Sequence, residues 1–262
     1  MQNFLISMYV FLSHDVDWRR QGPSKEHVMA RKERFDSIVI KNLDKQNPYY
    51  NIPEIMEIEE KFGIKSTFFF RTMYENGNFE DYEDDIKSLI GGGWEVGLHC
   101  DPSSVDDIEK LRTEKEKLEK LTKTKLEGNR AHYLKFTKKL PKMLKELGFS
   151  YDSSVRNSKD KIDKTEMGFQ NLDGLVEFPV TLMDAYLFTY MKLEEKQIIP
   201  TFKQTLDYAR KNDSKVITVI WHDNVLKMVG GRKYRDIVEF LASQKDVKIC
   251  RGADLASIVK NT

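Results

Sequence analysis

Short apolar runs alternate with charged, helix-like segments along most of this sequence. The first run, residues 4–12, is rich in strand-forming residues and too short to cross a membrane. Further strands are expected over residues 65–70, 94–99, 126–134, 149–155, 175–182, 215–221 and 247–250. Helices are expected over residues 53–62, 82–90, 106–125, 137–148, 201–211 and 234–243, and from residue 253 onward. Seven or eight β-then-α units predict an α/β fold whose parallel strands close into a barrel.

Three segments fit this alternation less well. Pro179 lies inside the run 175–182, which predicts an irregular or bulged strand. Residues 26–40 carry a weak helical pattern, and residues 156–173 carry none, so we expect a long loop there. An open, doubly wound sheet is the alternative fold, but no glycine-rich phosphate loop supports it, because residues 91–93 precede a strand.

Length, charge and cysteine content limit the classes of protein that remain. We expect one domain over residues 1–262, although two smaller domains would also fit this length. Charged residues make up 32% of the chain but the net charge is only +1, which predicts no nucleic-acid partner. Cys100 and Cys250 make no disulfide framework. No basic segment precedes the first apolar run, so we expect a cytoplasmic protein with no membrane partner.

Two aspartates, Asp15 and Asp17, follow the first apolar run two positions apart. Carboxylates this close repel each other and lose hydration unless a metal or an arginine holds their charge. One of the pair can then bind a divalent cation while the other acts as a general base. An acidic cap at the end of a strand is the alternative interpretation.

Other reactive side chains stand at or near the ends of the later expected strands. Three of the five histidines do so, together with an arginine, a tyrosine and several carboxylates: His99, Arg130, His132, Tyr133, Asp152, Asp184, His222 and Asp223. In a parallel barrel these ends form one rim, where active sites lie. The convergence of histidines and carboxylates on one rim predicts a metal-assisted hydrolase.

The order of these motifs resembles that of the polysaccharide deacetylases of carbohydrate esterase family 4. In that family a base aspartate precedes a metal-binding aspartate, as Asp15 precedes Asp17 here. His99 resembles the first of the family's two metal-binding histidines, residues 130–133 (Arg-Ala-His-Tyr) resemble its arginine motif, and His222 resembles its last motif. The resemblance implies an irregular, partly open β/α barrel of about seven parallel strands. It also implies one bound divalent metal, for which zinc is our first choice.

The second histidine of the family's metal pair is missing. It would stand four residues after His99, where this sequence has Ser103. Zinc sites in hydrolases usually have three protein ligands and an open position. We therefore expect Asp17, His99 and His132 to bind the metal, because His132 stands at the neighbouring rim position. The alternative is that His132 only packs under the barrel and the metal site is degenerate.

Amide hydrolysis suggests roles for the remaining rim residues. Asp15 would take a proton from the attacking water, and Arg130 would keep Asp15 ionised. The backbone N–H of Tyr133 would stabilise the oxyanion. His222 would protonate the leaving amine, oriented by Asp184 or, failing that, by Asp152.

Three residues near this site are expected to have no catalytic role. His14 adjoins the acidic pair but alternates toward the opposite face of its strand. His27 lies in a polar segment and should be solvated. Cys100, next to His99, should be a buried, inert thiol.

The sequence thus predicts a metal-dependent amide hydrolase that removes the N-acetyl group of an N-acetylated sugar, such as a precursor of a surface polysaccharide. A hydrolase of another linear or cyclic non-peptide amide is one alternative. A catalytically inactive barrel that only binds carbohydrate or a partner protein is the other.

Overall fold

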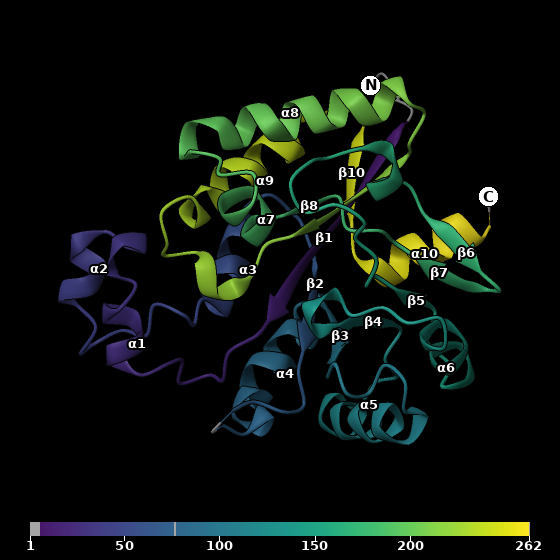
Figure 1. Cartoon of the computed structure of the whole chain (residues 1–262), viewed down its shortest axis with the longest axis horizontal. Helices are drawn as coiled ribbons and strands as arrows, with labels where there is room; N and C mark the ends of the chain where they lie inside the picture. The colour runs from purple at the N-terminus through teal and green to yellow at the C-terminus, as the bar shows by residue number, and fades with distance from the viewer. Residues whose placement is uncertain (1–5, 76, 262) are drawn as a thin grey trace.

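Ten strands form one curled, open sheet in the computed structural model, which describes residues 6–75 and 77–261 (Figure 1). They are β1 (Met8–Val16), β2 (Thr67–Phe70), β3 (Glu95–Cys100), β4 (Gly128–Ala131), β5 (Tyr151–Asp152), β6 (Gln170–Leu172), β7 (Leu175–Glu177), β8 (Leu182–Met183), β9 (Val216–Ile220) and β10 (Val247–Cys250). Their order is β6-β7-β5-β4-β3-β2-β1-β9-β8, with β10 also paired to β1. Every pairing is parallel except that of β6 with β7. The predicted partly open β/α barrel is confirmed.

Strand β1 has three neighbours and lies near the centre of the sheet. One edge pairs with β9 through residues 9–13. The other edge pairs with β10 through residues 8–11 and with β2 through residues 13–16. The pairing of β1 with both β2 and β9 continues beyond residue 12. The strand therefore does not stop there as predicted but runs to Val16, and Asp15 lies inside it. Residues 4 and 5 of the predicted run lie outside the described residues.

Helices cover the outside of the sheet. They are α1 (Lys25–Met29), α2 (Ser37–Lys41), α3 (Ile52–Lys61), α4 (Glu83–Gly91), α5 (Ile108–Thr122), α6 (Leu140–Glu146), α7 (Asp184–Thr189), α8 (Glu195–Lys211), α9 (Tyr234–Ser243) and α10 (Gly252–Lys260). Figure 1 shows α1 and α2 at one side of the molecule, apart from the other helices. None of the described helices is long and apolar enough to cross a membrane.

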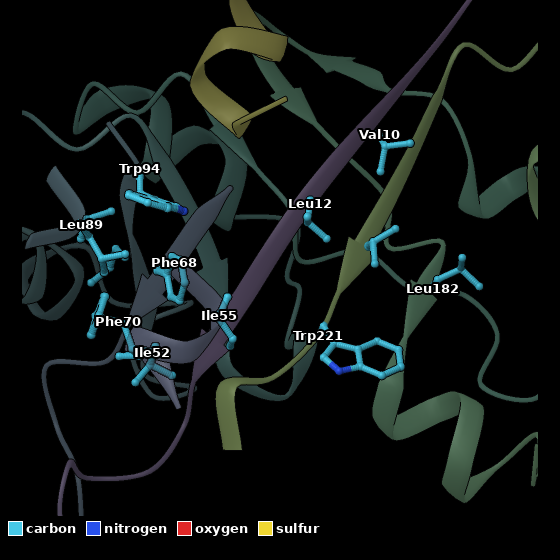
Figure 2. Close-up of a cluster of buried hydrophobic side chains, with 14 of the residues drawn as sticks. Val10, Leu12, Ile52, Ile55, Phe68, Phe70, Leu89, Trp94, Leu182 and Trp221 are labelled. Atoms are coloured by element: carbon cyan, nitrogen blue, oxygen red, sulfur yellow. The ribbon is translucent and has the colours of Figure 1, made fainter. Parts of the chain in front are cut away.

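Alternate residues of β1 enter two different cores. Val10 and Leu12 face the helices and join the larger cluster, which also holds Phe68, Phe70 and Trp221 (Figure 2). Phe11 faces the barrel interior and packs edge-on against three rings, those of Phe69, Tyr151 and Phe178. The strand therefore buries both faces, as central parallel strands do.

The aromatic cluster inside the barrel makes a floor beneath the rim. Helix α10 closes it from below with Leu255 and Ala256. Gly252 begins this helix so close to Tyr151 that a Cβ atom there would lie 2.2 Å from its ring. On the rim side, the Arg130 guanidinium lies 4.3 Å from the centre of the Phe69 ring. Polar groups above this floor are shielded from water on one side.

The predicted strand over residues 175–182 is wrong, because Pro179 divides it. Strand β7 pairs with β5, whereas β8 pairs with β9 at the other end of the sheet. The intervening residues bridge the gap between these edges: the N–H of Val180 donates to the carbonyl of Val155, and that of Thr181 to the carbonyl of Thr218. A proline can interrupt the ladder here because the chain is changing partners.

Other predicted boundaries also differ from the structure. The expected loop over 156–173 contains β6, a short antiparallel strand that hydrogen bonds to β7. Residues 26–40 form α1, a 3₁₀ turn at Lys32–Arg34 and α2 rather than one helix. Helix α8 starts six residues earlier than predicted, at Glu195, where Glu194 and Gln197 form a capping box, and Pro200 is accommodated in its second turn. Strand β4 ends at Ala131, where a 3₁₀ turn begins.

Candidate active site

The reactive side chains gather at the carboxyl ends of the central strands. Asp15 lies in β1 and Asp17 follows it, His99 lies in β3, and Arg130 lies in β4 with His132 just beyond. Asp184 begins α7 directly after β8, and His222 follows β9 by two residues. The parallel register explains this convergence, because His99 is paired with Arg130 and the neighbouring strands end at the same level.

Asp17, His99 and His132 bring three potential ligand atoms together. Asp17 Oδ1 lies 3.2 Å from His99 Nε2 and 3.2 Å from His132 Nδ1, and the two nitrogens are 3.2 Å apart. Tetrahedral ligands about 2.0–2.1 Å from a zinc ion stand about 3.3 Å from one another. The three atoms therefore form one face of such a tetrahedron, and two imidazoles with one carboxylate are a donor set that suits zinc.

The orientation of His99 makes its Nε2 atom available as a ligand. Its Nδ1 lies 2.8 Å from the carbonyl oxygen of Arg130, which can only accept a hydrogen bond. Nδ1 therefore carries the proton, and the Nε2 lone pair faces Asp17 and His132. A carbonyl partner of this kind fixes the tautomer of many metal-bound histidines.

His132, and not residue 103, lies beside His99. Ser103 is exposed, and its backbone N–H donates to Asp101 in the loop after β3. His132 is 7% exposed and its ring packs 3.9 Å from the ring of Tyr133. Burial is the main cause that lowers the pKa of His132, which favours the neutral form that binds metals.

Arg130 holds Asp15 from inside the barrel. Arg130 Nη1 donates to Asp15 Oδ1 at 2.7 Å, and its other N–H groups donate to Ser13 and Ser153, so the fully buried guanidinium is fixed. Burial raises the pKa of Asp15, but Arg130 and the imidazoles of His99 and His222 lower it by more, so the pKa is below its usual value. The other oxygen, Oδ2, lies 3.8 Å from His99 Nε2 and faces the three ligand atoms.

His222 is clamped by Asp184. The two carboxylate oxygens accept from the ring Nδ1 and from the backbone N–H of His222, each at 2.7 Å. His222 Nε2 therefore points toward the site, 3.5 Å from Asp17 Oδ2. Burial lowers the pKa of His222, but Asp184, Asp17 and Asp15 together raise it to about 10.

Asp152, the alternative partner for His222, lies elsewhere. It accepts hydrogen bonds from Asn129 and from the Ser154 hydroxyl, and no contact in the described chain joins it to His222. Burial raises the pKa of Asp152. It is paired in register with Asn129 and supports β4 instead.

Tyr133 has an unusual backbone at the turn that carries His132. Its φ is 61°, and Leu134 follows with φ 51°. Left-handed conformations are uncommon for residues other than glycine and often mark functional turns. The Tyr133 side chain is 82% exposed, so burial of its ring does not account for this conformation.

Two residues beside the site, Arg71 and Tyr49, were not singled out from the sequence. Arg71, directly after β2, places its Nη1 3.5 Å from the carbonyl of Asp17. Trp18, His27 and Tyr49 form an aromatic cluster in which ring centres are 4.8 to 5.9 Å apart. His27 is thus half-buried rather than solvated as expected. The position of Arg71 at a strand end was a usable signal, whereas nothing in the sequence pairs Trp18 with Tyr49.

Two cavities meet at the site. One, of about 700 Å³, extends from Asp17 and His222 toward Phe188 and Arg34. The other, of about 510 Å³, lies on the side of His132 and Tyr133. Asp17, Trp18 and His27 line both, so the candidate ligand Asp17 lies where the two open spaces join.

The comparisons with known proteins agree on the fold. No protein-family model matches the sequence, and no curated protein matches it. Among solved structures, a putative polysaccharide deacetylase from Mycobacterium smegmatis matches with a TM-score of 0.68 and 20% identity, over 100% of this chain and 92% of the other. The allantoinase PuuE matches with a TM-score of 0.69 and 14% identity, over 100% and 93%. A pseudoenzyme of carbohydrate esterase family 4 from Bacillus anthracis matches with a TM-score of 0.54 and 15% identity, over 95% and 65%. The chain therefore has the fold of the polysaccharide deacetylases.

Proposed function

We propose that this protein is a metal-dependent amide hydrolase that removes the N-acetyl group of an N-acetylated sugar. One observation carries the proposal: three mutually adjacent ligand atoms lie between an arginine-held aspartate and an aspartate-held histidine. A general base, a metal site and a general acid are what hydrolysis of an unactivated amide requires. The polysaccharide deacetylases that share the fold support the same reaction class.

Asp17, His99 and His132 would hold the metal, with zinc as our choice. Bound there, zinc would polarise the acetyl carbonyl and lower the pKa of the attacking water. Asp15 takes the proton of that water on Oδ2, the oxygen that Arg130 leaves free. Arg130 keeps Asp15 ionised between turnovers, because a buried carboxylate without a cation would take up a proton.

His222 and Tyr133 act on the substrate itself. The protonated His222 donates from Nε2 to the nitrogen of the leaving amine, while Asp184 holds the imidazolium through Nδ1. The backbone N–H of Tyr133 donates to the oxyanion that develops on the acetyl carbonyl. Trp18 and Tyr49 line the adjoining cavity and give the sugar ring apolar surface to pack against.

A cyclic amide is the second candidate substrate. It is favoured by the fold similarity to an allantoinase, which is as high as the similarity to the deacetylases. The same base and acid would serve either bond. The similarity to a pseudoenzyme keeps an inactive binding protein as the competing possibility.

Metal removal and substrate choice test the proposal together. Protein stripped with a chelator should release no acetate from N-acetylglucosamine or its short oligomers, and stoichiometric zinc should restore release. Hydrolysis of allantoin without acetate release would replace the sugar by a cyclic amide. No hydrolysis by zinc-loaded protein of allantoin or of any N-acetylated sugar, neutral or anionic, would refute catalysis.

The ligand assignment has a separate test. His132→Ala should leave metal content far below one equivalent after dialysis, because two ligands hold zinc weakly. Ser103→Ala, a change at the exposed position four residues after His99, is the matched control and should keep one equivalent. Full occupancy in His132→Ala would remove His132 from the ligand set.

A further inference from the structure

The larger cavity continues well beyond the candidate catalytic groups. Asp17, Asp184 and His222 line one part of it. One wall is formed by the segment between β1 and α3, which carries α1, the 3₁₀ turn and α2 and which Figure 1 shows standing apart from the barrel. The opposite wall comes from α7, the start of α8 and residues between 224 and 231. Trp18, Tyr49, Arg31 and Arg34 are among the side chains that this segment contributes.

The two arginines of this wall have no acidic partner. In the part of the chain that the structure describes, no carboxylate lies within ion-pairing distance of Arg31 or Arg34. Arg31 uses one N–H on the carbonyl of His27, and Arg34 makes no side-chain hydrogen bond among the described residues. Arginines elsewhere on the surface are commonly paired, as Arg232 is with Glu195 and Asp36.

The charges of both guanidiniums affect the pKa values of His27 and Tyr49, which line the cavity. Burial lowers the pKa of His27, and Arg31 and Arg34 lower it further. Burial raises the pKa of Tyr49, and the same two arginines oppose that rise. Their positive field therefore reaches the wall against which a ligand would pack.

The carboxylates of this cavity do not cancel that field. Asp17 lies beside His99, His132 and His222, and Asp184 is engaged by His222. Glu195 is engaged by Arg232 and by the backbone N–H of Gly230. Glu194 caps α8 and pairs with Lys196. Glu33 is the exception, an exposed carboxylate between the two arginines that pairs with no cation in the described chain.

We infer that the cavity binds an amino sugar that carries an anionic group, with the anion held by Arg31 and Arg34 and the N-acetyl group directed toward Asp17 and His222. The inference rests on the proposed deacetylase function and names its substrate class. Planar guanidiniums bind both phosphates and carboxylates in a bidentate manner, so the anion is a sugar phosphate or a uronic acid carboxylate. A cavity of about 700 Å³ has room for a sugar larger than one neutral ring.

Binding can be measured without turnover in zinc-loaded Asp15→Asn protein. The probes are N-acetylglucosamine, its 1-phosphate and N-acetylglucosaminuronic acid, titrated by calorimetry. Both anionic sugars, or one of them, should bind at least about tenfold more tightly than the neutral sugar, and that advantage should shrink as salt screens the charges. The tighter of the two anions identifies the source of the charge.

Four variants assign the effect to the arginines. Arg31→Gln combined with Arg34→Gln should abolish the preference for the anion and leave neutral-sugar affinity within about twofold. Lys32→Gln, an exposed cation of the same turn that does not line the cavity, is the matched control and should change nothing. Glu33→Gln should strengthen anion binding. Arg34→Gln alone should lose part of the preference for the anion. This single variant keeps the inference testable if the double variant misfolds.

The outcomes separate this inference from the proposed function. Equal affinity for neutral and anionic sugars in the parent protein, or an anion preference that survives in the double variant, would overturn the inference even if wild-type protein releases acetate. An arginine-dependent preference for the anion would support it even if wild-type protein releases none.

Discussion

Two histidine–carboxylate clusters lie on opposite faces of β1, and they differ in how fully their polar atoms are paired. On the helix-facing side His14 is completely buried between the carbonyl of Trp221, 2.6 Å from Nδ1, and Glu59, 2.9 Å from Nε2. Glu59 also accepts from the side chains of Ser66, Trp94 and Tyr234. Every ring nitrogen and carboxylate oxygen of this outer cluster has a partner.

The inner cluster begins one residue later with Asp15, and its polar atoms are not all paired in this way. Asp17 Oδ1, His99 Nε2 and His132 Nδ1 face one another at 3.2 Å, and when His132 carries its ring proton on Nε2 all three atoms are acceptors that repel one another. A structural network places donors opposite acceptors, whereas a ligand site gathers acceptors around a missing cation. The completeness of hydrogen bonding, more than residue type or burial, thus distinguishes the two clusters.

The largest effect expected from this comparison is on turnover in the inner cluster. Asp15→Asn should lower kcat by up to about 10⁴-fold with metal content unchanged, because an amide cannot accept the proton of water. Asp17→Asn should instead lose metal first. Metal analysis and steady-state kinetics on both proteins test these roles. If Asp15→Asn loses metal and Asp17→Asn keeps metal but loses turnover, Asp15 is the ligand and Asp17 the base. Asp106→Asn, an exposed acid after β3, should leave both properties unchanged.

The outer cluster should respond in stability rather than in chemistry. Glu59→Ala leaves His14, Trp94 and Tyr234 without their shared partner and should lower the free energy of unfolding by about 3–5 kcal/mol. Glu60→Ala, the adjacent residue, removes only a surface pair with Lys65 and should cost less than about 1 kcal/mol. Denaturant titrations compare the two. A Glu59→Ala protein that is as stable as wild type but binds no zinc would mean that the outer cluster serves metal binding and not stability.

The smallest of the three effects is a difference between two substrates. His222→Ala should reduce amide hydrolysis about 10²-fold more than hydrolysis of an aryl acetate, because an aryl oxide leaves without a proton. Kinetics on an N-acetyl sugar and on 4-nitrophenyl acetate measure the difference, with zinc content as the control. Equal losses on both substrates, or loss of zinc, would give His222 a structural or ligand role.

The sequence predicted the fold and the rim well, because both follow from local patterns. Apolar runs and turn residues locate the strands, and parallel pairing brings their carboxyl ends together, so Asp15, His99 and His222 could be placed on one edge. The division of residues 175–182 was harder to predict. It depends on which distant strands accept each half, and Pro179 alone signals only an irregularity.

Side-chain partners were less predictable than strand ends. Both Asp152 and Asp184 were available to His222, and only the pairing of β8 with β9 places Asp184 beside it. The wall formed by residues 18–51 could not be foreseen, because its short helices carry little periodicity and dock through Tyr49, Phe35 and Met228. Contacts of this kind are set by tertiary packing, which a local pattern does not encode.

The central position of β1 has a consequence for how the chain folds. Its first ladder partner along the sequence is β2, yet the register also pairs Ser13 with Ile220, about two hundred residues away. Pairings between such distant segments form slowly and leave an apolar strand edge exposed until they do. Both histidine–carboxylate clusters include groups that follow β9, Trp221 in one and His222 in the other. Neither cluster is complete before that late step, so recovery of amide hydrolysis during refolding, which needs His222, should coincide with docking of β9 and lag behind helix formation.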